Sequence, residues 1–247
     1  MKIAIFGHAR SGSTMLYYIL EQHLLAAGLI EEWAGISEAF NPHRNRLLIC
    51  NPQGHLENII LGSSLPTRQF REERVELFNK HLNDDYLIKV MSHDTTCTSV
   101  IDTVVDNYTI IAVERKNVIS ACLSGLIAFH HSIWNVQDNT QPKYEPFVAT
   151  TEELQLIGLG ISRYYYWRDK LNPQAIVYYE DMATQTTEDT LRQTGLYQGG
   201  VPTNDTPTRK LLSFEEKTKL ILNLDEALDH FYGIISAYGI DIEHNEL

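Results

Sequence analysis

Short apolar runs alternate with longer amphipathic stretches along the chain. The apolar runs have the length of buried strands, and they cover residues 2–6, 86–91, 109–113 and 175–179. The longer stretches either repeat their apolar residues every three or four positions or are charged and helical in composition. They cover residues 13–27, 67–82, 100–105, 117–130 and 151–171. Further helices are expected up to Leu191, from about Phe214 and near 225–237. Strands that alternate with helices indicate βαβ units. The pattern therefore predicts an α/β fold with a central parallel β-sheet flanked by helices.

Two segments lack a regular pattern. Residues 29–64 are expected to be irregular, because Asn41-Pro42 and Asn51-Pro52 are turn signals. Residues 134–148 are polar and contain proline, which favours a surface loop or lid. No repeat or composition shift marks a domain boundary, so residues 1–247 are expected to form a single domain.

Composition excludes several classes of protein. Apolar residues make up 43% of the chain and charged residues 21%, which is typical of a globular protein with a sizeable core. The net charge of −12 argues against a nucleic-acid partner, because phosphate binding needs clustered Lys and Arg. The three cysteines form no CxxC pair, and no apolar stretch is long enough to span a membrane. We therefore expect a cytoplasmic protein without a metal site or membrane insertion.

Residues 7–14 read Gly-His-Ala-Arg-Ser-Gly-Ser-Thr between a predicted strand and a predicted helix. The glycines have the spacing of a P-loop, which points backbone N–H groups and a helix N-terminus at an anion. A triphosphate-binding P-loop has Lys directly after its second glycine, but this chain has Ser13 there and Arg10 inside the loop. The loop therefore suits a 5'-phosphate that carries one further charged group better than a triphosphate.

The segment Arg10-Ser11-Gly12-Ser13-Thr14-Met15-Leu16 resembles the 5'-phosphosulfate loop of sulfotransferases that use 3'-phosphoadenosine-5'-phosphosulfate (PAPS). The loop of that family has a basic residue, Ser-Gly, two Ser or Thr, any residue and Leu. The resemblance implies a three-layer P-loop-like fold. It also implies that Arg10 contacts the phosphosulfate, and that the loop residues Ser11, Gly12, Ser13 and Thr14 hold the phosphate.

A second anion site is expected after the strand at 109–113, where the chain continues Glu-Arg-Lys-Asn. In the sulfotransferase family an Arg at such a strand end and a helical Ser, eight or nine residues later, bind the 3'-phosphate. Ser124 follows Arg115 by nine positions and Lys116 by eight, so it fits better than Ser120. The Arg-Lys-Asn sequence is most similar to that of bacterial trehalose-type carbohydrate sulfotransferases. Whether Arg115 or Lys116 takes the phosphate stays open.

Two residues compete for the role of catalytic base. Glu38, in Ser-Glu-Ala-Phe, resembles the Glu of a Gly-Glu-x-Phe segment in trehalose-type enzymes, where it is the proposed base. His93 follows Lys89 by four positions and resembles the His of the cytosolic sulfotransferases, whose Lys and His are two apart. The local sequence favours Glu38, whereas the ordinary pKa of a histidine favours His93. Lys89 is expected to contact the sulfuryl group, and His8 is a further possibility for the base.

Two later segments complete the resemblance. Tyr179-Glu180-Asp181-Met182 resembles a Tyr-Glu-Asp-Leu motif found late in many sulfotransferases, and we interpret it as structural. Arg209 and Lys210 resemble basic residues that close over the adenosine and the 3'-phosphate. The family implies transfer of a sulfuryl group from PAPS to a hydroxyl or amine of a small-molecule or carbohydrate acceptor, without a metal. The alternatives are a P-loop kinase for a small molecule, a non-catalytic nucleotide-binding relative and a structural protein.

Overall fold

The computed structural model describes most of the chain. It covers residues 1–31, 34–36, 39–40, 46–50, 56–60, 67–80, 86–133, 143–199 and 212–239, of which 46–50, 56–60, 67–68 and 78 are described by their backbone alone.

Five parallel strands form the central sheet, in the order β2 (Gly35–Ile36), β5 (Leu87–Met91), β1 (Ile3–Gly7), β6 (Thr109–Glu114) and β7 (Ala175–Tyr178). All five residues of β1 are buried, as expected for a strand that has neighbours on both sides and helices on both faces. Gly7 lies opposite Met91 and Val113, so these three strands end at one edge of the sheet. The predicted parallel sheet is confirmed.

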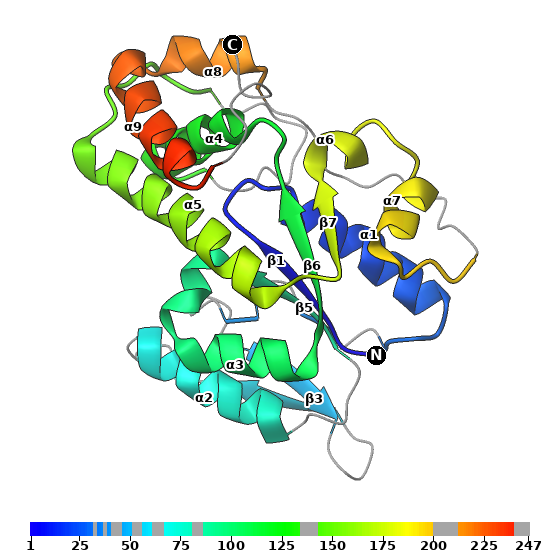
Figure 1. Cartoon of the computed structure of the whole chain (residues 1–247). Helices are drawn as coiled ribbons and strands as arrows, with labels where there is room; N and C mark the ends of the chain where they lie inside the picture. The colour runs from blue at the N-terminus through cyan, green and yellow to red at the C-terminus, as the bar shows by residue number, and fades with distance from the viewer. Residues whose placement is uncertain are drawn as a thin grey trace.

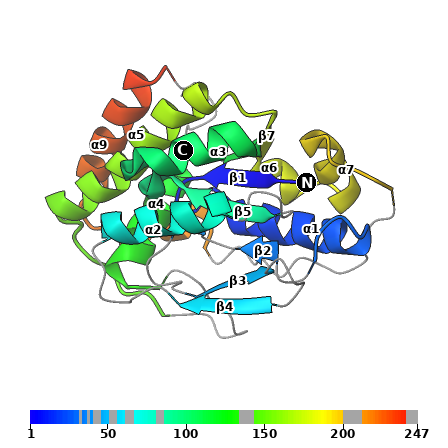
Figure 2. The same cartoon turned by 90° about the horizontal axis from the view of Figure 1, so that it is seen from below.

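Helices cover both faces of this sheet. On one face lie α1 (Ser13–Ala26) and α7 (Thr187–Thr194), and on the other lie α3 (Thr98–Asn107) and α5 (Thr151–Leu171), as Figures 1 and 2 show from two directions. A helix α2 (Thr67–Lys80) packs on α3. Beyond the carboxyl ends of the strands lie α4 (Val118–His130), α6 (Tyr179–Met182), α8 (Phe214–Leu220) and α9 (Leu224–Ala237) (Figure 1). The three-layer α/β fold expected from the sequence is therefore present.

Hydrogen-bonded caps fix where the helices begin. The Asn117 side chain accepts from the Ser120 N–H at 2.6 Å, which starts α4 one residue after Asn117. Thr150 and Glu153 form a capping box at the start of α5. After β7 we expected one helix through Leu191, but the chain forms α6 and then α7, because Thr186 caps a new helix.

The prediction that residues 29–64 are irregular is wrong. They include β2 and an antiparallel pair, β3 (Arg46–Cys50) and β4 (Leu56–Ile60), in which Arg46 lies opposite Ile60. β3 contains Leu47-Leu48-Ile49 and β4 contains Ile59-Ile60, and the Asn51-Pro52 turn signal stands between them in the sequence. The pair lies next to β2, outside the five-stranded sheet (Figure 2). Within the described part of the chain, no helix has the length and apolar character needed to cross a membrane.

Candidate functional site

The loop between β1 and α1 has a backbone that only particular residues favour. Arg10 has φ 66° and Gly12 has φ 96°, so both lie in the left-handed region. A Cβ on Gly7 would lie 2.7 Å from Ser11 Oγ, and a Cβ on Gly12 would lie 2.6 Å from the Tyr179 ring. The two glycines therefore allow the loop to turn tightly and to pack under Tyr179.

Hydroxyl groups and a buried lysine line this loop. Lys89, on β5, is 2% exposed and donates from Nζ to Thr14 Oγ1 at 3.0 Å. Ser11 Oγ is buried and has no hydrogen-bond partner among the described residues. A buried hydroxyl without a partner is costly, and a bound anion would satisfy it. The loop therefore has the donors that an oxyanion needs.

Arg115 joins the ends of three strands. It follows β6, and its Nε donates to the carbonyl oxygen of Arg10 at 3.0 Å. Its guanidinium carbon lies 3.6 Å from the centroid of the Tyr179 ring, directly after β7, and its Nη1 lies 3.6 Å from Glu180. Lys116 points elsewhere, because its Nζ lies 2.5 Å from Asp181 Oδ1 at the surface. Of the two cations, Arg115 is the one that borders the pocket described below.

The charges at this junction favour an anion. Burial lowers the pKa of Arg10, and the nearby charge of Arg115 lowers it further. Burial also lowers the pKa of Arg115, although Glu180 acts in the opposite direction. Arginine is not deprotonated in proteins, so these buried guanidinium groups stabilise an added negative charge more strongly than they would in water.

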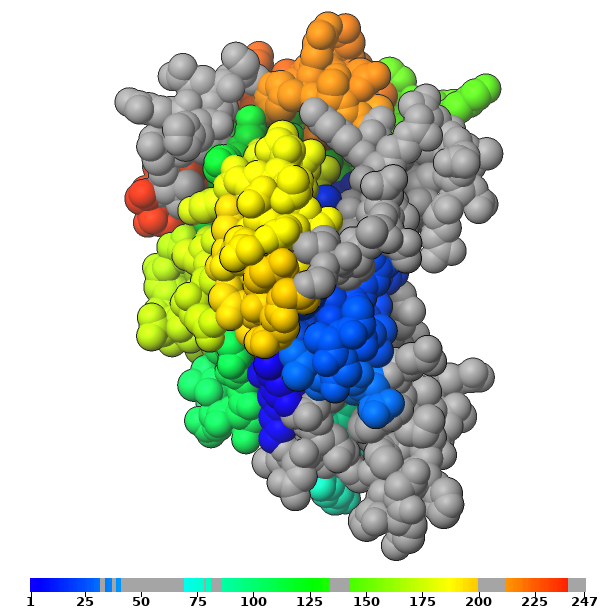
Figure 3. All heavy atoms as spheres, turned by 90° about the vertical axis from the view of Figure 1, so that its right-hand side faces the viewer, coloured from blue at the N-terminus to red at the C-terminus, as the bar shows by residue number. Residues whose placement is uncertain are grey.

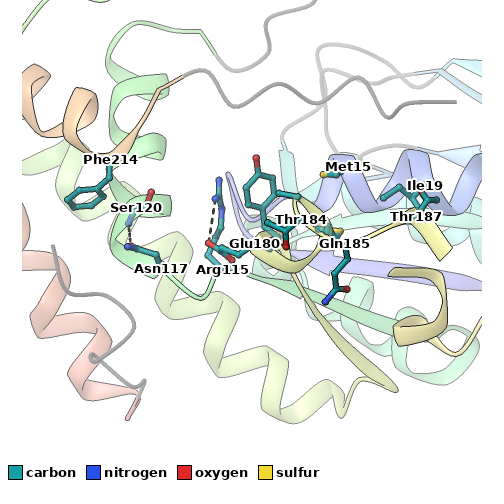
Figure 4. A pocket seen from close by; sticks show the side chains of 13 residues that line it. Met15, Ile19, Arg115, Asn117, Ser120, Glu180, Thr184, Gln185, Thr187 and Phe214 are labelled. Atoms are coloured by element: carbon teal, nitrogen blue, oxygen red, sulfur yellow. Dashed lines mark hydrogen bonds and ion pairs between the residues drawn. The ribbon is translucent and has the colours of Figure 1, made fainter. Parts of the chain in front are cut away.

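An open pocket lies beside Arg115. It has a volume of about 740 Å³ and is lined by Met15, Ile19, Arg115, Asn117, Ser120, Tyr179, Glu180, Met182, Ala183, Thr184, Gln185, Thr187 and Phe214. Figure 4 shows Arg115 and Glu180 between the start of α4 on one side and Met15 and Ile19 of α1 on the other. In the space-filling view, α6 and α7 lie directly against α1 (Figure 3). The pocket thus combines a cation with apolar side chains.

Ser120, which lines this pocket, is held from behind the lining by a buried lysine. Lys217, on α8, is 3% exposed and donates to Ser120 Oγ at 2.8 Å and to the Ser120 carbonyl at 3.2 Å. Ser124, which the sequence favoured, lies one turn further along α4 and is not part of the lining. Sequence reasoning missed Lys217, because its only signal was a lysine in a charged helix.

Of the two candidate bases, His93 lies among the described residues and Glu38 does not. His93 lies in the 3₁₀ helix η2 (Ser92–Thr96) after β5, and its side chain is half exposed. Its Nε2 is 3.6 Å from Asp94 Oδ1, a buried carboxylate that Arg71 also holds. Glu38 lies outside the described residues, but the next residue, Ala39, is buried and donates from its N–H to the Lys89 carbonyl at 3.0 Å. Arg209 and Lys210 also lie outside them.

His8 is a buried part of the loop. Burial lowers its pKa to about 4, so the ring is neutral near pH 7. Its Nδ1 donates to the Ala9 carbonyl at 2.8 Å, and its ring meets the edge of Tyr164 on α5. Its other ring nitrogen, Nε2, is buried and has no hydrogen-bond partner among the described residues. Among the described residues, no group of His, Cys, Asp or Glu could hold a metal ion.

The site and the fold agree with a comparison against known families. A family model described as the sulfotransferase family matches residues 2–194, which include the loop, Lys89, Arg115 and Tyr179. The chain belongs to the sulfotransferase family and is a transferase of sulfuryl groups. A search of curated proteins found no match to it.

Proposed function

We propose that this chain transfers the sulfuryl group of PAPS to a hydroxyl or amine of a small-molecule or carbohydrate acceptor. The observation that supports this most is the contact of Arg115 with both the Arg10 carbonyl and the Tyr179 ring, beside the pocket. It gives two adjacent cationic positions at one edge of a parallel sheet, where ligands of such folds bind. PAPS carries two separate anionic groups joined by a nucleoside.

The residues present fit this donor. In the proposal, Arg10 and the loop donors, including the buried hydroxyl of Ser11, take the phosphosulfate. Arg115 takes the 3'-phosphate with a serine of α4, either Ser124 or the pocket-lining Ser120. The apolar side chains of the pocket face the adenosine. Arg209 and Lys210 are proposed to close over it from the later part of the chain.

The reaction forms a bond between sulfur and the acceptor oxygen or nitrogen and breaks the bond between sulfur and the 5'-phosphate oxygen. The acceptor proton passes to a base, and negative charge develops on the departing phosphate. In the proposal, Arg10 of the loop and Lys89 of β5, which donates to Thr14 where the loop enters α1, stabilise this charge. Charge stabilisation and alignment are sufficient for this chemistry, so the proposal requires no metal.

The base is proposed to be Glu38, with His93 as the alternative. The hydrogen bond from Ala39 to the Lys89 carbonyl attaches the chain next to Glu38 to the strand that carries Lys89. Once an acceptor is known, Glu38→Gln should keep nucleotide affinity and lose transfer. Full transfer by Glu38→Gln, together with loss in His93→Ala, would assign the base to His93 instead.

The proposal is tested by calorimetric titration with adenosine 3',5'-bisphosphate, AMP, and ATP with Mg²⁺. Micromolar affinity for the bisphosphate, about −8 kcal/mol, is expected to exceed the affinity for the other two. Arg115→Ala should remove the advantage over AMP, whereas Lys116→Ala should keep it, because Lys116 is paired with Asp181 at the surface. Preference for ATP with Mg²⁺ would favour a kinase, and binding of the bisphosphate without any transfer would favour a non-catalytic relative.

A further inference from the structure

A buried lysine of α8 is attached to the first turn of α4. The Nζ of Lys217 donates to both oxygens of Ser120, to the hydroxyl at 2.8 Å and to the carbonyl at 3.2 Å. Because both acceptors belong to one residue, the ammonium group fixes the Ser120 side chain relative to its own backbone. Lys217 lies beyond residues 2–194, the part of the chain that the family model matches, so membership of the family assigns it no role.

Hydrogen bonds fix α8 at both ends. Ser213 and Glu216 form a capping box at its start. At its end, the Leu220 carbonyl accepts from the N–H of the buried Phe147 at 2.8 Å. The helix packs on α4 between these two attachments. The fold therefore sets the position of the Lys217 ammonium group, so that Lys217 can orient a side chain of α4.

Ser120 belongs to the same pocket as Arg115. Asn117 and Phe214, the first residue of α8, line the pocket with them. Figure 4 shows Asn117 and Ser120 together on one side of Arg115. The Asn117 side chain accepts from the Ser120 N–H at 2.6 Å, so Ser120 is held through its backbone as well as through its hydroxyl. A ligand in the pocket can therefore meet Arg115 and Ser120, whereas Ser124 is not part of the lining.

The Ser120 hydroxyl has a hydrogen to donate. A serine hydroxyl accepts through its lone pairs and donates through its single hydrogen, so the bond from Lys217 leaves that hydrogen available. Among the described residues, this hydroxyl donates to no other group. The adjacent ammonium group polarises the hydroxyl and makes it a stronger donor. A hydroxyl of this kind, in a pocket that also contains a guanidinium group, suits an oxyanion.

We propose that Lys217 is a positioning residue of the 3'-phosphate subsite. It holds Ser120 so that the hydroxyl donates to one oxygen of the 3'-phosphate, while Arg115 binds the others. The inference rests on the proposed PAPS-dependent function, and it extends that function to α8. It also selects Ser120, rather than Ser124, as the serine of the subsite.

Adenosine 3',5'-bisphosphate and AMP test this role, because they differ by the 3'-phosphate alone. The measured quantity is the ratio of their affinities in calorimetric titrations. Lys217→Met keeps the length of the side chain and removes its charge, and it should reduce the preference for the bisphosphate about tenfold. Ser120→Ala should reduce the preference by a similar factor. The double variant should lose no more than either single variant, because both changes remove the same bond to the phosphate.

Lys219→Met is the matched control. Lys219 lies on the same helix, in an exposed ion pair with Glu215, so its loss should leave the preference within about twofold. A lysine that only supports the packing of α8 on α4 would give a different result. Lys217→Met would then weaken both ligands equally or change neither, and the unchanged ratio would overturn the proposal. Losses that add in the double variant would overturn it as well.

The choice of serine has its own test. Full preference in Ser120→Ala, together with a loss in Ser124→Ala, would assign the phosphate to Ser124 and disprove the role of Lys217. Should circular dichroism show that Lys217→Met is unfolded, Lys217→Gln takes its place with the same expected result. Failure of the proposed function looks different, because the unaltered protein would then show no preference for the bisphosphate over AMP.

Discussion

The guanidinium carbon of Arg115 lies 3.6 Å from the centre of the Tyr179 ring. The ring in turn lies over Gly12, so that no side chain fits at that position. The end of β6, the start of α6 and the phosphate loop are thereby joined through one aromatic ring. The orientation of Arg115 depends on this contact, on the Arg10 carbonyl and on Glu180.

Replacing Tyr179 tests this contact. Tyr179→Leu should weaken adenosine 3',5'-bisphosphate binding about tenfold, because a cation–π contact contributes about 0.5–2 kcal/mol and here it orients Arg115. Tyr179→Phe keeps the ring and should bind nearly as well as the unaltered protein. Isothermal titration calorimetry measures both. Equal affinities of the Leu and Phe variants would show that the ring does not orient Arg115.

Gly12→Ala should damage the loop. The backbone has φ 96° there, and the new Cβ would lie 2.6 Å from the Tyr179 ring, so we expect a loss of about 1–3 kcal/mol in the free energy of unfolding, together with weaker bisphosphate binding. Gly233→Ala is the control, since it lies within α9 with no atom near the new Cβ and should stabilise slightly. Urea unfolding measures the free energy of unfolding of both variants. A Gly12→Ala variant as stable as the unaltered protein would contradict the described loop.

Lys89→Met should slow the chemistry more than it weakens binding. The substitution keeps the length of a buried side chain but removes the cation that donates to Thr14, and loss of one stabilising donor typically costs about 10²–10³ in rate. The rate at which PAPS is split into sulfate and the bisphosphate, with water as acceptor, reports it. Lys116→Met, at an exposed ion pair, should leave this rate within about twofold. Equal rates in the two variants would exclude Lys89 from the reaction.

His8 should make stability depend on pH. Burial lowers its pKa to about 4 from the ordinary 6.5, so the unfolded chain binds a proton between these values while the folded chain does not. The free energy of unfolding is therefore highest above pH 6.5, and it falls by about 3 kcal/mol in total as the pH drops toward 4. Between pH 7 and pH 5, urea unfolding should show a smaller loss of unfolding free energy for His8→Asn than for the unaltered protein. An equal loss in both proteins would mean that His8 does not titrate in this way.

The sheet and the loop were predictable from the sequence because their signals are local. The strand at residues 109–113 is an apolar run next to charged residues, and the loop at 7–14 has a fixed spacing of glycines. The β3–β4 pair was missed because two short strands with a turn signal between them resemble irregular chain when no third strand is evident. Their pairing is a relation between two segments, which periodicity within either one does not reveal.

The site could be predicted only in part. Arg10 and Arg115 stood in recognisable segments, but the choice of Arg115 over Lys116 depends on Tyr179 and Asp181, more than sixty positions away. Lys217 could not be found, because a buried lysine in a charged helix has the same sequence pattern as an exposed one. Contacts between distant segments decide which polar residues turn inward.

The place of β1 in the sheet has a consequence for how the protein is made. Ile3 pairs with Leu87 on one side and with Thr109 on the other, so β1 finds both of its neighbours only after the chain has been synthesised as far as β6. The loop at its end receives its last support, Tyr179, later still. The loop is therefore one of the later parts of the fold to be completed during synthesis, and until then the nascent apolar strand must be kept from other chains.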